Sequence, residues 1–188
     1  MAAFLLAFVP VAEAADAAAG EKKAEVCVAC HGPGGNSASA EFPSLAGQPP
    51  LYVFYQLIQF REERRKDARM SPFAAKLTDA DMKDIAEYFS AQKVAPLAEK
   101  ADAAKAAAGK AVADRNHCGS CHMPDFRGQQ HIARLAGQHN AYLVKELRGF
   151  KTGARPDIDG SMASAAQPLT DEDIQNVAHF LATLPAEK

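Results

Sequence analysis

The chain has 188 residues, of which 48% are hydrophobic and 23% are charged, and its formal net charge is −2 at pH 7. This length and composition allow one large or two small domains with a buried core. The near-neutral charge argues against a nucleic-acid partner, because nucleic-acid-binding domains carry an excess of Lys and Arg.

Residues 1–14 are predicted to form a signal peptide. An apolar run is followed by the small-residue cleavage pattern Ala12-Glu13-Ala14, which is typical of exported proteins. The usual basic segment is missing, so the true start codon can lie upstream. The run is too short to span a bilayer. An uncleaved membrane anchor and a plain buried helix are the alternatives.

The pattern C-x-x-C-H occurs twice and is the attachment signature of c-type haem. Two thiols three positions apart lie on one face of a helical turn, where they can add to the two vinyl groups of a haem. The adjoining His can then bind the iron. The two patterns use all four Cys of the chain. They predict two covalently attached haem c groups held by Cys27, Cys30, His31, Cys118, Cys121 and His122.

Paired Cys residues also occur in redox dithiols and in zinc sites. A thioredoxin-like dithiol does not need a His after its second Cys, and it lies in a βαβ unit that this sequence does not predict. The two pairs could share one zinc ion, but they lie far apart in the sequence and both carry the His. Covalent haem attachment in bacteria takes place outside the cytoplasm, which agrees with export to the periplasm.

The second half of the chain repeats the first with an offset of about 90 residues. The segment Leu-Ala-Gly-Gln occurs at 45–48 and at 135–138, and Tyr52 corresponds to Tyr142. The segment Leu-Thr-Asp occurs at 77–79 and at 169–171. Because order and spacing are both kept, the chain is predicted to contain two copies of one domain. We place these domains at 15–91 and 109–188, with a linker or the start of the next helix at 92–108.

Each unit is predicted to be all-α. A helical stretch leads into the Cys pattern, and a Gly/Pro/Ser-rich loop follows. An amphipathic helix comes next, at about 50–65 and 139–151, and its apolar residues at helical spacing are Leu51, Tyr52, Phe54 or Tyr55, and Ile58. A loop with a Met then leads to a closing helix, which Thr78 and Thr170 are expected to cap. Part of the linker, 97–108, can continue as the first helix of the second unit.

The second axial ligands are predicted to be Met70 and Met162, which occupy corresponding loop positions of the repeat. Met82 lies on the core face of a helix, where Met usually packs. Ligation by two histidines would need a different rule in each half, because His131, His139 and His179 have no counterpart in the first unit. His117 directly precedes Cys118 and is expected to be exposed or near the haem edge. With both axial positions filled, no substrate reaches the iron, so one-electron transfer is the expected activity and no catalytic residue is predicted.

These repeated patterns resemble the dihaem cytochrome c4 family, over about residues 15–185. The resemblance implies two tandem class I cytochrome c-type domains, with haem propionates near the face between them. It also implies electron delivery in the periplasm, with the membrane-bound respiratory chain and a terminal oxidase as usual partners. In such domains a Pro carbonyl commonly accepts a hydrogen bond from the proximal His. Pro43 fits this place, and Ala133 stands at the matching position.

Two further functions compete with a free electron shuttle. One is a tightly bound cytochrome subunit of a dehydrogenase, such as the flavocytochrome c type that oxidises sulfide. The other is a dihaem enzyme such as a peroxidase or a thiosulfate-oxidising cytochrome. It is disfavoured because peroxidases need an open iron and a larger chain, and because no Cys is left over to be an axial ligand. The charged run 61–69 is net positive. It is interpreted either as a docking patch for an acidic partner or as a solvated helix end with internal ion pairs.

Overall fold

The computed structural model describes residues 14–97 and 99–186, and every regular element within these ranges is a helix. The predicted signal peptide, residues 1–14, lies outside the described residues apart from Ala14. An isolated bridge between Gln129 and Ile132 is the only β-type pairing in the described ranges. The all-α prediction is therefore confirmed. None of the described helices is both long enough and apolar enough to cross a bilayer.

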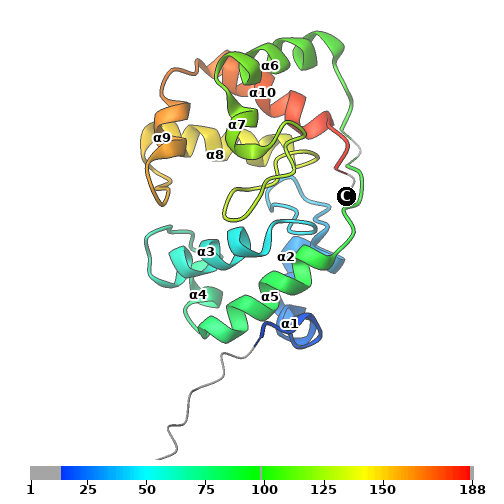
Figure 1. Cartoon of the computed structure of the whole chain (residues 1–188), viewed down its shortest axis with the longest axis vertical. Coiled ribbons are helices and arrows are strands. Elements are labelled where there is room, and N and C mark those ends of the chain that lie inside the picture. Colours follow the sequence, from blue (N-terminus) through cyan, green and yellow to red (C-terminus); the bar gives the residue numbers. More distant parts are fainter. Residues whose placement is uncertain (1–13, 98, 187–188) are drawn as a thin grey trace, which may run out of the picture.

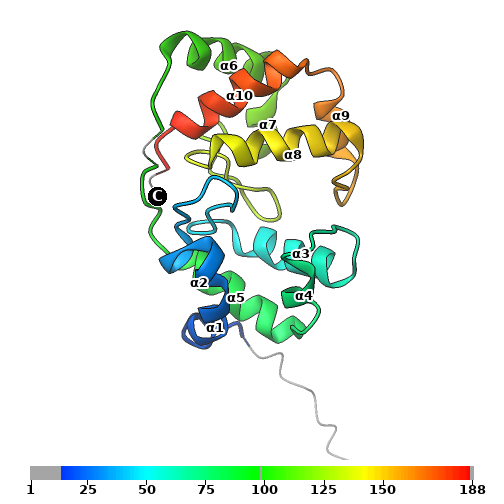
Figure 2. The same cartoon turned by 180° about the vertical axis from the view of Figure 1, so that it is seen from behind.

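Two similar helical units lie one above the other, and the long loops of both meet between them (Figure 1, with the opposite face in Figure 2). The first unit contains α1 (Ala17–Lys23), α2 (Glu25–His31), the 3-10 helix η1 (Pro33–Gly35), α3 (Pro50–Arg61), α4 (Ser71–Ala74) and α5 (Asp79–Ala91). The second contains α6 (Ala103–Arg115), α7 (Cys118–His122), α8 (Asn140–Thr152), α9 (Ser161–Ala166) and α10 (Asp171–Thr183).

The closing helices α5 and α10 begin where the sequence predicts. The hydroxyls of Thr78 and Thr170 accept from the backbone N–H of Asp81 and Asp173, and those two carboxylates accept from the Thr backbone in return. These reciprocal bonds satisfy donors that a helix start leaves unpaired.

The helix predicted at 50–65 ends at Arg61, and α6 begins at Ala103 after its cap Asp102 rather than at 97. Met162 was expected in a loop but lies within the short helix α9, where its backbone N–H donates to Asp157.

Each unit has its own apolar core. In the first, α5 contributes the fully buried Met82 and Phe89, and in the second, α10 contributes Ile174 and Leu181. The predicted apolar face of α3 was partly wrong. Leu51 and Tyr55 are 41% and 36% exposed, whereas Tyr52, Phe54 and Ile58 pack against the first core beside the buried Val53 and Leu57. Two separate cores agree with two tandem domains, whose boundaries at 15–91 and 109–188 stay a prediction.

A glycine marks the close approach of helices in each unit. A Cβ on Gly20 of α1 would lie 2.0 Å from the carbonyl oxygen of Asp84 on α5. A Cβ on Gly109 of α6 would lie 2.0 Å from the carbonyl oxygen of Asn176 on α10. Any side chain at either position would push the two helices apart, because a packed interior has no room for an added methyl group.

Replacing Gly109 by Ala is expected to destabilise the holoprotein. Ala is the better helix former by about 1 kcal/mol, but overpacking typically costs about 1 to 3 kcal/mol. The clash with a backbone carbonyl should outweigh the gain. Urea unfolding followed by circular dichroism measures the change, with Ala108→Leu on the exposed side of α6 as the control. Equal or higher stability of Gly109→Ala would contradict the close packing.

Candidate functional site

Two buried histidines present the same arrangement. His31 ends α2 and His122 ends α7, and they are 4% and 7% exposed. The Nδ1 of His31 donates to the carbonyl oxygen of Pro43 at 2.9 Å, and the Nδ1 of His122 donates to that of Ala133 at 2.9 Å. A carbonyl oxygen only accepts, so the proton is on Nδ1 and the lone pair is on Nε2.

Burial lowers the pKa of both imidazoles below the ordinary value, which keeps the rings neutral near pH 7. The Nε2 of His31 is buried without a hydrogen-bond partner. A neutral ring with a free Nε2 is the form that binds a metal, and an orphaned buried nitrogen of this kind calls for a ligand.

No disulfide joins the four cysteines, of which Cys27 and Cys118 are half-buried and Cys30 and Cys121 are exposed. Burial, assisted by Cys30, raises the pKa of Cys27 to about 11, and burial also raises the pKa of Cys118. Redox dithiols instead have a lowered pKa. A zinc ion shared by both pairs would need at least three ligand side chains together, and the described residues form no such group.

One cavity of about 550 Å³ brings the predicted residues together. Its walls include His31 and Met70 from the first unit and His122 and Met162 from the second. Cys27, Cys118 and Cys121 also line it, whereas Cys30 does not. Apolar side chains of α3, α8 and α10 complete the walls, among them Leu57, Leu143 and Val177. An imidazole, a thioether and thiols around an apolar space are the groups that hold a haem c.

The remaining Met and His residues are placed differently. Met82 does not line the cavity and is fully buried in the first core, as the sequence predicts. His139 donates through Nε2 to the carbonyl oxygen of Ser37 at 2.9 Å, and His179 accepts from the backbone of Asp102. His117 and His131 line the cavity, and the His131 ring lies edge-on to Tyr55 of the other unit.

Comparisons with known proteins first give the class. Residues 106–185 match the family model for cytochrome c, and residues 14–89 match that for cytochrome C oxidase, cbb3-type, subunit III. The chain therefore consists of two tandem cytochrome c-type domains.

Three similar proteins narrow the class to a family. Cytochrome c4 of Azotobacter vinelandii is 38% identical over 192 residues, covering 91% of this chain and 90% of the relative. The crystal structure of reduced recombinant cytochrome c4 from Pseudomonas stutzeri has a TM-score of 0.85 at 34% identity, covering 92% of this chain and 100% of that one. A thiosulfate dehydrogenase electron acceptor of Thiomonas intermedia is 35% identical, covering 89% of this chain and 82% of the relative.

The chain belongs to the cytochrome c4 family. It is a dihaem electron-transfer cytochrome that binds two haem c groups covalently.

A buried polar cluster between the two units was missed by the sequence analysis. Glu146 on α8 accepts from Arg65 at 2.9 Å and from Arg155 at 2.5 Å, and all three side chains are at most 12% exposed. Both arginines also donate to Gln56, at 2.5 and 3.2 Å. Arg65 reaches the hydroxyl of Tyr142, and Arg155 that of Tyr52. Burial by itself lowers the pKa of Arg65, but Tyr142 and Glu146 raise it overall.

The residues of this interface cluster occupy corresponding positions in the two copies of the repeat. Arg65 corresponds to Arg155 and Tyr52 to Tyr142 at an offset of about 90, so a pseudo-two-fold relation exchanges the contacts. The symmetry is broken at one position, where Gln56 stands opposite Glu146. The sequence did contain a signal for this cluster, because these polar residues recur in both copies of the repeat although they lie on no predicted core face. All six residues also line the cavity with the predicted haem ligands.

The charged run 61–69 is occupied by ion pairs within the protein. Arg61 pairs with Asp79, Arg64 with Glu62, and Arg69 with Asp67 and Glu41. Arg65 is the buried partner of Glu146. Four of the five cations of the run therefore have a carboxylate partner within the protein, as the interpretation of internal ion pairs requires.

Glu146→Gln is expected to destabilise the holoprotein by about 3 to 5 kcal/mol, because two buried guanidinium groups then lose their carboxylate. Urea unfolding measures the loss. Adding Gln56→Glu to this variant should restore much of it, since Gln56 already contacts both arginines. Full stability of Glu146→Gln, or no recovery in the double variant, would show that the carboxylate does not hold the units together.

Proposed function

We propose that this chain carries single electrons in the periplasm, from respiratory-chain or dehydrogenase donors to a terminal oxidase or a similar acceptor. Cys27, Cys30, His31 and Met70 would hold the first haem, and Cys118, Cys121, His122 and Met162 the second. The observation that carries this proposal is the repeated one: each unit places a carbonyl-bound imidazole and a thioether on the wall of one apolar cavity.

When bound, a haem c supplies an iron that gains or loses one electron. The residues of the chain set the conditions for this change. The Nδ1–H bonds of His31 and His122 hold each ring with Nε2 free, and the thioethers of Met70 and Met162 favour ferrous iron. The apolar side chains of the walls would lower the exposure of each haem to water. Arg65 and Arg155 put positive charge on the shared wall, which suits the carboxylates of a haem.

Exposed apolar side chains support electron transfer to partner proteins at the surface. Val26 directly precedes Cys27, and Met123 directly follows His122, and they are 61% and 37% exposed. Phe73 and Ile158, which are 52% and 57% exposed, lie close in sequence to Met70 and Met162. Apolar residues around a redox site allow a transient contact without burying charge.

Removing one thioether should open one iron. Met70→Ala and Met162→Ala are each expected to give a ferrous protein that binds carbon monoxide at one haem, while the unaltered protein binds none. Absorbance titration measures the stoichiometry. Met82→Leu is the matched control, because Met82 belongs to the core and not to the cavity. An unaltered six-coordinate spectrum in both Ala variants would show that the ligand assignment is wrong.

The alternative is a tightly bound acceptor subunit of a dehydrogenase. It is supported by the similarity to the thiosulfate dehydrogenase electron acceptor of Thiomonas intermedia. Size-exclusion chromatography of native extract, followed at haem and flavin absorbance, separates the two functions. Elution near the monomer mass without flavin is the expected result. Elution of the haem with a second chain at much larger mass would contradict the free carrier and make the chain a subunit.

A further inference from the structure

Two glutamines, Gln48 and Gln138, each form a pair of hydrogen bonds to the backbone of the other unit, and we call each pair a clasp. The side chain of Gln138 accepts from the backbone N–H of Ser44 at 2.9 Å and donates to its carbonyl oxygen at 3.0 Å. Gln48 makes the same pair of bonds to Arg134, at 2.9 and 3.0 Å. Both glutamines are 2% exposed. Each is the last residue of a Leu-Ala-Gly-Gln segment, and haem ligation alone does not explain why this segment is repeated.

The clasped residues directly follow the residues that hold the histidines. The carbonyl of Pro43, which accepts from His31, and the N–H of Ser44, which donates to Gln138, belong to one peptide group. In the second unit the peptide group between Ala133 and Arg134 accepts from His122 and donates to Gln48. Each of these peptide groups therefore joins a histidine of its own unit to a glutamine of the other.

Hydrogen bonds in such a chain strengthen one another. A peptide N–H that donates polarises its own carbonyl, which then becomes a better acceptor. A stronger bond to Nδ1–H makes the imidazole a more basic ligand. A more basic ligand stabilises ferric iron and lowers the reduction potential. The glutamine of one unit is thus placed to act on the histidine of the other.

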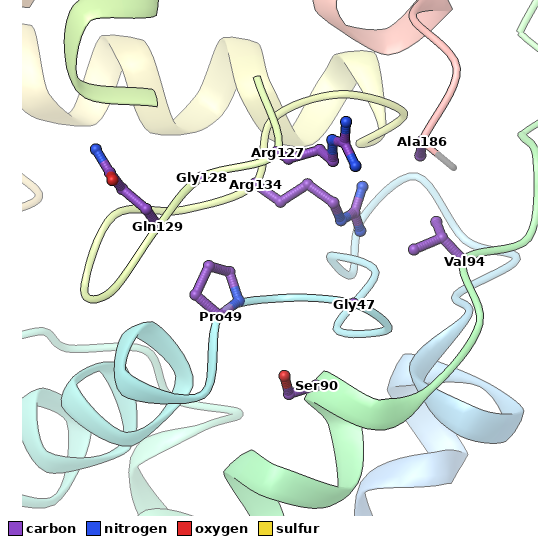
Figure 3. Close-up of a pocket in the computed structure, with 9 residues that line it drawn as sticks. All are labelled: Gly47, Pro49, Ser90, Val94, Arg127, Gly128, Gln129, Arg134 and Ala186. Atoms are coloured by element: carbon purple, nitrogen blue, oxygen red, sulfur yellow. The ribbon is translucent and has the colours of Figure 1, made fainter. Parts of the chain in front are cut away.

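The side chain of Arg134 adds a further contact between the loops that carry the clasps. The guanidinium of Arg134 donates to the carbonyl oxygen of Ala46 in the other unit at 3.0 Å, and also to Ala136. Figure 3 shows its side chain extending toward Gly47, where an added Cβ would lie 4.0 Å from Nε of Arg134 and 2.6 Å from Val94. Burial lowers the pKa of Arg134 to about 10.

We propose that Gln138 and Gln48 are crossed positioning residues: Gln138 tunes the haem bound by His31, and Gln48 tunes the haem bound by His122. The inference rests on the proposed function, because it takes both histidines as iron ligands. It adds that the contact between the units influences the reduction potential of each haem. Loss of the contact would raise the potential of each haem through the glutamine of the opposite unit.

The test uses the holoprotein with Gln138→Met and Gln48→Met, which keep the length of the side chain and remove its polar groups. In the diamagnetic ferrous protein, the NMR signal of the His31 Nδ1–H should move upfield in Gln138→Met while that of His122 stays. Gln48→Met should give the reverse. In each variant the equilibrium constant for reduction of the haem in the opposite unit should rise only about two- to threefold, because the bond to the histidine is weakened and not lost: a neighbouring bond strengthens a hydrogen bond by about 10–30%.

Two further variants keep the test decisive. His139→Leu breaks a bond between the units, to Ser37, without touching either peptide group, so it should leave both Nδ1–H signals in place. Gln138→Glu keeps an acceptor for Ser44 should Gln138→Met fail to fold, and it should retain the His31 bond. Equal shifts at both haems, shifts at the haem of the variant's own unit, or no shifts would overturn the inference. Lack of His ligation would instead overturn the proposed function, and the spectra of the unaltered protein reveal it separately.

Discussion

The hydrogen bond from each buried imidazole to a backbone carbonyl is the interaction on which the site depends. It fixes the tautomer, aims Nε2 away from the loop and holds the ring at the end of a short helix. The carbonyls of Pro43 and Ala133 can do this only if their loops are themselves held in place. The backbone bonds of the following residues to Gln138 and Gln48 provide that support from the opposite unit.

The contact between the units is polar, although each unit is built around an apolar core. The described chain has two separate clusters of buried apolar residues, one in each unit. Between them lie paired glutamine amides and the cluster around Glu146. Buried polar groups must be satisfied or they cost stability, so only one docking of the units suits them. A fixed docking keeps the two redox sites at a constant separation.

Much of the site could be predicted from the sequence because covalent haem attachment needs its ligands in a short, recognisable pattern. The repeat pointed to Met70 and Met162, which recur while Met82 does not, and both line the cavity; their ligation of iron stays a prediction. The missed residues belong to contacts between the units. Arg65 meets Glu146, and Gln48 meets Arg134, across 81 and 86 residues. No local periodicity encodes such pairs, and the exposed Leu51 shows how tertiary packing overrides an apolar pattern.

The repeat itself carries information about the interface once the fold is known. Some polar residues occur in both copies of the repeat but lie on no core face. When a pseudo-two-fold relation exchanges the contacts of the two units, such residues can bind the opposite unit. Gln48 and Gln138 are an example, because each bonds the backbone of the other unit. Positions where the copies differ then mark where the two sites differ. Gln56 opposite Glu146 changes the charge of the shared wall, and Ser44 opposite Arg134 adds a cation to one clasp only. Two haems bound by identical ligand sets would thereby lie in unequal surroundings.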